Sequence, residues 1–175
     1  MTASLAPARA ASASTPILRP ESPKDAPLVE ALIDRAFGPG RYAKAAERLR
    51  EGNTPLLDIS FTAWLGERLV GCVRMWPAHV GDQPVVFLGP FAVEGEFRKL
   101  GVGGALIRRA CEAAAKAGHA VILLVGDAPY FERFGFHQVP VGRIVLPGPV
   151  DPRRVLALPL KPDAEANLQG RVRPG

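Results

Sequence analysis

The chain has 175 residues, 47% of them hydrophobic, which is enough to bury a core of ordinary size in one domain. Its lysines and arginines (22) outnumber its aspartates and glutamates (17), which gives a net charge of +5. These basic residues are not interleaved with aromatic residues as they are in nucleic-acid-binding surfaces. The composition therefore argues against a nucleic-acid partner and favours an anionic small-molecule ligand.

The cysteines and histidines show no ligand or disulfide pattern. Cys72 and Cys111 are isolated, and the three histidines, His79, His119 and His137, do not stand at ligand spacing from them or from each other. We therefore expect no metal site and no disulfide, and free cysteines suit a reducing cytoplasm. No apolar run approaches the length of a membrane span, so no membrane partner is expected.

The N-terminal residues 1–15 are rich in Ala, Ser and Pro, which predicts a disordered extension, with a targeting peptide as the alternative. A folded domain is predicted for residues 16–162. It begins with a strand at 17–20 and an amphipathic helix at 26–37. A second, more polar helix is predicted at 42–50, before the chain enters its sheet.

Apolar runs predict the remaining strands and one long helix. Three consecutive strands form an antiparallel meander, and a helix beginning after Arg98 separates the third strand from the fourth. Such a crossover makes those two strands parallel. The last two strands form an antiparallel pair, and residues 163–175 are predicted to be an irregular tail. The predicted strands are 57–65, 69–80, 85–93, 121–125, 138–145 and 154–160.

Three glycines, Gly101, Gly103 and Gly104, gather where the third strand of the meander gives way to the long helix. A helix start leaves amide groups without partners at the positive end of the helix dipole, and glycines let an anion approach them. The neighbouring Arg98 and Lys99 add positive charge. The alternative is that the glycines only ease packing, but their place beside two basic residues favours anion binding.

Two nucleotide-binding motifs fail at this point. A dinucleotide fingerprint requires a glycine three residues after Gly103, where Leu106 stands. A P-loop requires Lys-Ser or Lys-Thr after its last glycine, and neither pair follows a glycine in this chain. What remains is Arg98-x-x-Gly101-x-Gly103 after the strand end Phe91-Ala92-Val93.

This pattern resembles the acetyl-CoA signature Arg/Gln-x-x-Gly-x-Gly/Ala of the GNAT superfamily of N-acetyltransferases. Residues 130–136 (YFERFGF) resemble the family's Tyr-x-x-x-Gly-Phe segment. The resemblance implies an α+β, GNAT-like fold: a mixed, mostly antiparallel sheet flanked by helices, with one parallel pair splayed at the cofactor site. It also implies acetyl-CoA as co-substrate and no metal.

The residues themselves predict a break in the central strand, because Pro90 cannot donate to a sheet ladder and Gly89 invites a bulge. An ordinary edge irregularity is the alternative. The resemblance assigns the backbone beyond the break to the pantetheine arm and the glycine loop to the CoA pyrophosphate. The implied cofactor-binding residues are Phe91, Ala92, Val93, Arg98, Lys99, Gly101, Val102, Gly103 and Gly104.

In GNAT enzymes the acceptor amine attacks the thioester directly. The family's proton-donating tyrosine stands four positions before Gly-Phe, where this chain has Phe131; Tyr130 precedes it, about a third of a helical turn away. Tyr130 as general acid, proton donation by water, and a purely structural Tyr130 are the alternatives. Glu94 is the first candidate for the general base, followed by Glu96 and Asp127, each against the alternative of a solvated loop carboxylate.

The region around the second helix lines the acceptor side in GNAT proteins. Substrate contact and solvated helix surface are the two interpretations of its polar residues, Arg41, Tyr42, Arg48 and Glu51. The leading hypothesis is an N-acetyltransferase that acts on a primary amine of a small metabolite or peptide. A catalytically idle acyl-CoA-binding module is the alternative, supported by Phe131, and a nucleic-acid-binding protein is a third, disfavoured one. The oligomeric state is open, a homodimer included.

Overall fold

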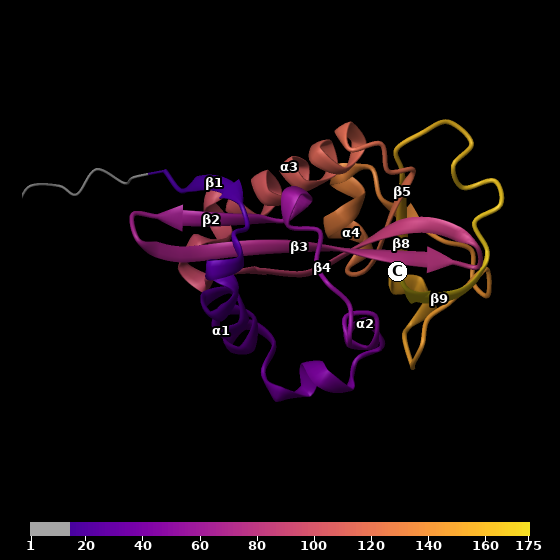
Figure 1. The fold of residues 1–175 in the computed structure, drawn as a ribbon, viewed down its shortest axis with the longest axis horizontal. Coiled ribbons are helices and arrows are strands. Elements are labelled where there is room, and N and C mark those ends of the chain that lie inside the picture. The colour runs from indigo at the N-terminus through magenta and orange to yellow at the C-terminus, as the bar shows by residue number, and fades with distance from the viewer. Residues whose placement is uncertain (1–14) are drawn as a thin grey trace, which may run out of the picture.

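The structure is a computed structural model that describes residues 15–175, so the disordered extension predicted for residues 1–15 lies almost entirely outside the described residues. Within the described part of the chain, strands form one sheet, with α3 and α4 on one face and α1 and α2 on the other (Figure 1). The helices are α1 (Ala26–Phe37), α2 (Ala45–Arg48), α3 (Val102–Lys116) and α4 (Ala128–Phe131). The strands are β1 (Ile17–Pro20), β2 (Phe61–Leu65), β3 (Arg68–Val80), β4 (Gln83–Val93), β5 (Val121–Val125), β6 (His137–Gln138), β7 (Ile144–Val145), β8 (Val155–Pro159) and β9 (Gly170–Pro174).

The order of strands confirms the predicted sheet. The path runs β1-β2-β3-β4-β5-β8-β6, and β4–β5 is its parallel pair while its other neighbours run antiparallel. The connection from β4 to β5 passes through α3, as a parallel pair requires. A short parallel ladder between β7 and β9 adds to this sheet at its margin.

The prediction of an irregular tail at residues 163–175 is wrong for Gly170–Pro174, which form β9. β3 is 13 residues long, and β2 pairs only with its first part, up to Val73. The last part of β3, residues 78–80, pairs with β9, which brings the buried side chain of Val172 onto the sheet. β9 has a single buried apolar residue between exposed arginines, so its sequence carries almost no periodic signal and its pairing depends on the distant edge of β3.

Three other boundaries also differ from the prediction. The helix expected at 42–50 is a 3-10 turn (Pro39–Ala43) followed by the short α2. The strand expected from residue 57 begins at Phe61, after a 3-10 turn at Leu57–Ile59. The strand expected at 138–145 is divided, because β6 pairs with β8 whereas β7 pairs with β9. Glycine, proline and loop contacts override the apolar pattern at each of these places.

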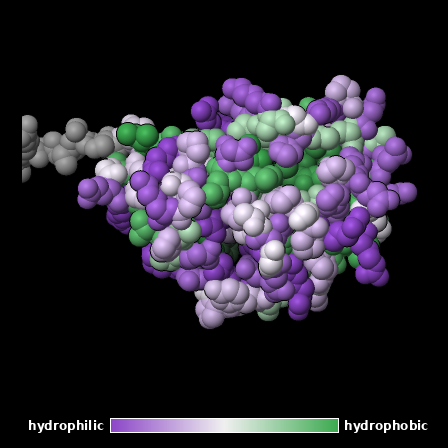
Figure 2. Space-filling view, viewed as in Figure 1, coloured by the Kyte–Doolittle hydropathy of each residue, from purple (hydrophilic) through white to green (hydrophobic). Residues whose placement is uncertain are grey.

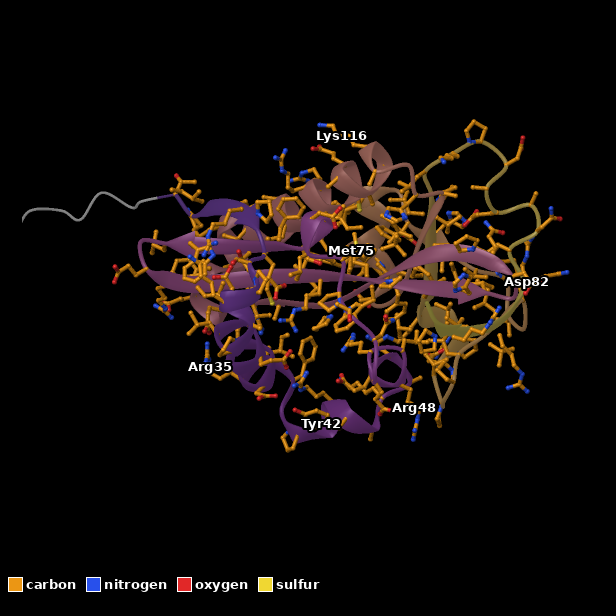
Figure 3. The ribbon with its side chains drawn as sticks, in the orientation of Figure 1. Arg35, Tyr42, Arg48, Met75, Asp82 and Lys116 are labelled. Atoms are coloured by element: carbon orange, nitrogen blue, oxygen red, sulfur yellow. The ribbon has the colours of Figure 1, made fainter. Side chains whose placement is uncertain are left out.

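Apolar side chains fill both faces of the sheet. On one face α3 packs Leu106 and Ala110 into a cluster that includes Met75, which lies near the middle of the sheet (Figure 3). On the other face α1 and α2 cover separate clusters, which include Ile33 and Leu49. Figure 2 shows a band of apolar side chains between hydrophilic ones on the viewed face. The helices of the two faces therefore approach the central strands from opposite sides.

Candidate functional site

The site begins at a break in the central strand. Between Val73 and Met75 of β3, the single residue Arg74 faces two residues of β4, Gly89 and Pro90, which is a β-bulge. Gly89 has φ +132°, a conformation that side chains rarely adopt, and its carbonyl accepts a 2.6 Å hydrogen bond from Trp76 Nε1. The residue types that predicted a break therefore produce one at that place.

The bulge ends the pairing of β4 with β5. The parallel ladder consists of Val86 with Ile122 and Phe87 with Leu123, and it stops there although β4 continues to Val93. β5 beyond this point pairs with β8 on its other side. The backbone of residues 91–93 thus keeps one neighbour, β3, and faces a gap on the β5 side. The predicted splaying of β4 from β5 is therefore present beyond Phe87.

The start of α3 lies next to that gap. Gly101 adopts the left-handed conformation (φ +76°) between a 3-10 turn (Gly95–Leu100) and α3, and the space around its Cα is open. Arg98 and Lys99 are exposed on this turn, and Arg98 Nε donates to the Val93 carbonyl at 3.3 Å. The first amides of α3, which belong to Val102, Gly103 and Gly104, have no acceptors within the helix. Strand end, cations and helix start are therefore adjacent.

Gly103 has a packing role as well. A Cβ at this position would lie 2.9 Å from both Phe91 Cζ and Tyr130 Oη. The absence of a side chain at Gly103 lets these two rings, whose centroids are 6.0 Å apart, lie against the first turn of α3. The structure thus supports the packing interpretation for Gly103 and leaves Gly101 open to solvent.

Tyr130 and Phe131 occupy different environments. Phe131 is buried and packs edge-on against Tyr130 and Phe136, with ring centroids 5.1 and 5.8 Å away. Tyr130 is half-buried, with its hydroxyl beside Gly103. Burial raises the pKa of Tyr130 above its ordinary value of 10.0, although the charges of Arg133 and Arg108 oppose this. The Tyr130 phenol therefore keeps its proton at neutral pH.

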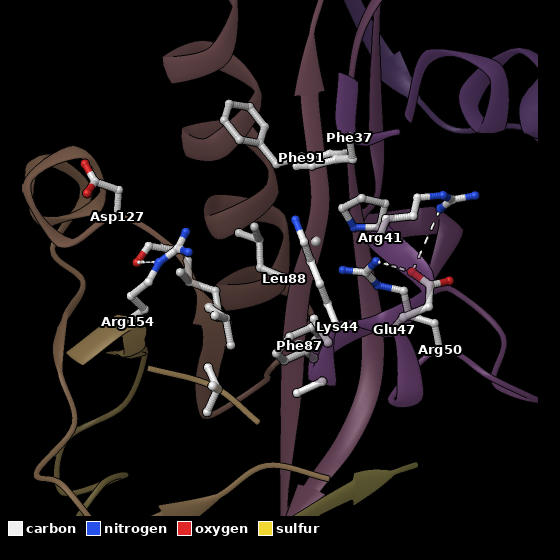
Figure 4. Close-up of a pocket in the computed structure, with 18 of the residues that line it drawn as sticks. Phe37, Arg41, Lys44, Glu47, Arg50, Phe87, Leu88, Phe91, Asp127 and Arg154 are labelled. Carbon is white, nitrogen blue, oxygen red and sulfur yellow. Dashed lines mark hydrogen bonds and ion pairs between the residues drawn. The ribbon is translucent and has the colours of Figure 1, made fainter. Parts of the chain in front are cut away.

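A cavity of about 480 Å³ opens at the gap on the side of α1 and α2. Its walls are residues 87–91 of β4, residues 124–127 at the end of β5, the end of α1, α2 and the loop at 149–151. Figure 4 shows Asp127 and Arg154 on one side of it, Arg41, Glu47 and Arg50 on the other, and Lys44 between them. The gap thus has the glycine loop on one face of the sheet and this cavity on the other.

An ion-pair network joins the bulge to the cavity wall. Arg74, opposite the bulge and 4% exposed, binds Glu21 (Nη2–Oε1 2.6 Å) and Glu30. Glu30 also accepts from Arg41 at 2.9 Å, and Arg41 lies between α1 and α2. Partial burial raises the pKa of Glu30, but Arg41 and Arg74 outweigh it and hold that pKa below its ordinary value of 4.5. The network fixes α1 and the turn before α2 to the sheet.

The structure does not bring Glu94 into the cavity. Its carboxylate accepts a 2.7 Å hydrogen bond from Arg35 of α1 on the outer side of the strand end. Asp127, the other strand-end candidate, lines the cavity and is exposed. Glu96 forms an ion pair with Arg68, also outside the cavity.

The acceptor-side candidates are divided in the same way. Arg41 lines the cavity, whereas Tyr42, Arg48 and Glu51 are exposed and do not. Tyr42 and Arg48 lie at the periphery in Figure 3. The sequence analysis did not identify three further cavity residues, Lys44, Arg50 and Arg154. No motif marks them, and they reach the gap only because α2 and the loop before β8 approach it in the fold.

Within residues 15–175, no group of three His, Cys, Asp or Glu side chains is placed to hold a metal ion. Over the same stretch, none of the helices has the length and apolarity needed to traverse a bilayer.

Comparison with known proteins identifies the family. A model described as "Acetyltransferase (GNAT) family" matches residues 27–136, more than half of the chain. YhbS of Escherichia coli (strain K12), described as an uncharacterized N-acetyltransferase, is 30% identical over 122 residues, 69% of this chain and 72% of YhbS. The chain belongs to the acetyltransferase (GNAT) family. Membership confirms both the resemblance inferred from the sequence and the expected acyltransferase class.

Solved GNAT structures confirm the fold. The crystal structure of YhbS from Escherichia coli in complex with CoA has a TM-score of 0.79 and 26% identity, with 96% of this chain and 94% of that chain covered. A GNAT family acetyltransferase from Brucella melitensis in complex with acetyl-CoA has a TM-score of 0.69 and 26% identity, with 91% and 96% covered. The first of these structures contains CoA and the second contains acetyl-CoA.

The lowered pKa of Glu30 predicts a pH dependence of stability. A carboxylate whose pKa is lower in the folded state contributes stability that is complete above its ordinary pKa of 4.5 and is lost as pH falls through the folded value. The difference in unfolding free energy between wild type and Glu30→Gln, measured in urea, should therefore shrink from about pH 6 to about pH 3. Glu51→Gln, an exposed site without an ion pair among the described residues, is the control. A difference that stays constant over this range contradicts the prediction.

Proposed function

We propose that this GNAT protein transfers an acetyl group from acetyl-CoA to a primary amine by direct attack on the thioester. The observation that carries the proposal is the gap between β4 and β5, which lies between the α3 start on one face and the cavity on the other. An amine bound in the cavity is then next to a thioester that lies in this gap. The CoA and acetyl-CoA complexes of the two solved relatives support the same ligand here.

The cofactor is held mainly by backbone groups in this proposal. Residues 91–93 offer N–H and C=O groups to the pantetheine amides on the side that lacks a strand partner, as in strand addition. Arg98, Lys99 and the amides of residues 101–104 receive the pyrophosphate at the positive end of α3. The carbonyl oxygen of the thioester is polarised by a backbone N–H at the splayed strand, and such a donor contributes about 3 kcal/mol.

Direct attack fits the nucleophiles that the chain offers. The cavity wall contains no cysteine or serine among the described residues. Burial raises the pKa of both Cys72 and Cys111 to about 12, so neither provides a thiolate at neutral pH. The nitrogen of the acceptor therefore forms its bond to the acetyl carbon itself, the carbon–sulfur bond breaks, and CoA leaves as a thiolate.

Two protons then move. The ammonium formed on the acceptor passes one proton to Asp127, which replaces Glu94 as the proposed base because it lines the cavity while Glu94 is paired with Arg35. The thiolate takes one proton from Tyr130, whose raised pKa keeps it protonated. The products are the N-acetylated acceptor and CoA with a free thiol, and water then takes the proton from Asp127 and returns one to the Tyr130 phenolate, which restores both groups.

Ligand-induced stabilisation and thiol release test the proposal together. Acetyl-CoA at 100 times its Kd stabilises the fold by ~2.7 kcal/mol, which raises the melting temperature by roughly 5–10 °C. Arg98→Gln should reduce this shift, and Arg171→Gln on β9 should not. A panel of amines should then release CoA thiol in an acceptor-dependent way. No shift at millimolar acetyl-CoA refutes the proposal, and a shift without acceptor-dependent release supports the idle acyl-CoA-binding module, which Phe131 in the usual tyrosine position favours.

The role of Tyr130 has its own prediction. Tyr130→Phe removes only the hydroxyl, so kcat should fall by about 10-fold, at the low end for general acids because a thiolate leaves easily. The KM for acetyl-CoA and the melting temperature should change little. Tyr42→Phe, the same change at the chain's other tyrosine, is the control. An unchanged kcat in Tyr130→Phe assigns protonation to water.

A further inference from the structure

We propose that the cavity takes a small primary amine that also carries an oxyanion, a carboxylate in the first instance, and that Lys44 and Arg154 bind this anion. The inference rests on the proposed function, because it names the class of acceptor for the same cavity. It starts from the charges that the cavity wall leaves uncompensated.

Two of the three carboxylates on the wall are already paired with arginines. Glu47 accepts from Arg50 at 2.9 Å, and Asp151 accepts from Arg153, a residue outside the cavity, at 2.8 Å. Glu47 is also the nearest cavity carboxylate to Arg41, at 3.9 Å. Arg41 is paired more closely outside the cavity, with Glu30 and Asp34 at 2.9 Å each, so Glu47 serves mainly Arg50 and Asp127 remains as the third carboxylate.

Two cations on the wall have no carboxylate partner among residues 15–175. Lys44 Nζ lies 5.2 Å from the centre of the Phe37 ring, and Arg154 Nε donates to the Gly126 carbonyl at 3.3 Å. Both side chains are exposed and line the cavity, and Figure 4 shows Lys44 in the middle of it with Arg154 to one side. Arg50 is paired with Glu47, but its buried Nε has no hydrogen-bond acceptor and remains a free donor. The wall thus carries a surplus of positive charge.

The anion that this surplus fits belongs to the acceptor and not to the cofactor. The cofactor phosphates are assigned to Arg98 and the α3 start, and α3 packs on the opposite face of the sheet from α2. The cavity cations lie on the α1 and α2 side. A single CoA molecule therefore does not place its phosphates at both sets of cations.

The surplus also favours the reactive form of such an acceptor. An amine attacks only when it is neutral, and an amine that carries a carboxylate is then a net anion, whereas its ammonium form is a zwitterion. Neighbouring cations disfavour the ammonium and lower its pKa. Lys44 and Arg154 thus bind the acceptor and increase its nucleophilic fraction, while Asp127 receives the proton released after attack.

The size of the cavity limits the acceptor. Its volume of about 480 Å³ is in the range of small-ligand sites, and the acetyl end of the cofactor shares that volume. An amine of amino-acid size fits this space.

Matched pairs of L-amino acids and their carboxamides test the proposal, with CoA thiol release as the readout and kcat/KM calculated for the neutral amine. The wild type should prefer the best acids over their amides by about 10-fold or more, because a hydrogen bond to a charged group is lost in the amide. Lys44→Gln and Arg154→Gln should each reduce this preference several-fold. Arg48→Gln, which removes the same charge from α2 outside the cavity, should leave it unchanged.

Phosphoethanolamine and ethanolamine form a second pair that separates a phosphate from a carboxylate preference. Preference for the phosphate member alone, lost in the Lys44 and Arg154 variants, supports the oxyanion site and reassigns its ligand. The proposal is overturned if kcat/KM is equal for acids and amides and shows no preference for the phosphate. It is also overturned if the preference for acids is unchanged in both the Lys44 and the Arg154 variants. Stabilisation by acetyl-CoA with no anionic acceptor used also overturns it and leaves cofactor binding intact, whereas no stabilisation is the failure of the proposed function.

Discussion

The two-residue bulge at Gly89 and Pro90 is the constraint on which the rest of the site depends. It ends the parallel ladder after Phe87 while β3 continues to hold β4 on the other side, so a gap forms inside a sheet that stays intact. Proline has no N–H for the ladder, and Gly89 tolerates the positive φ that the bulge requires. This gap lies between the start of α3 on one face of the sheet and the cavity on the other.

The two faces carry different charges for different purposes. On the α3 face, backbone amides and Arg98 present positive potential over a helix start. On the opposite face, positive charge comes from side chains. Arg41 and Arg74 there are paired with Glu30 of α1, and Arg74 also with Glu21, which follows β1. The paired arginines hold the wall in place, and the unpaired cations remain available for a ligand. The presence of a carboxylate partner thus distinguishes the arginines that hold the fold together from the cations proposed to bind a ligand.

The sequence predicted the parts of this design that local chemistry specifies. The bulge residues, the glycine loop after Arg98 and the continuous apolar run of β5 each follow from a residue type with one strong preference. The cavity cations were not predicted, because Lys44 and Arg154 come from segments more than 100 residues apart that only the finished fold brings together. β9 was not predicted for the same reason, since its partner strand β3 lies far away in the chain.

Hydrogen exchange of the backbone amides with and without acetyl-CoA tests the central claim most directly. If the pantetheine arm lies in the gap and the pyrophosphate at the helix start, exchange should slow by about tenfold or more at residues 91–93 and 102–104, a protection that reflects cofactor-dependent ordering. The outer strands β1 and β2 should exchange at an unchanged rate apart from the global gain in stability. Protection confined to other segments, with these two unchanged, would contradict the account.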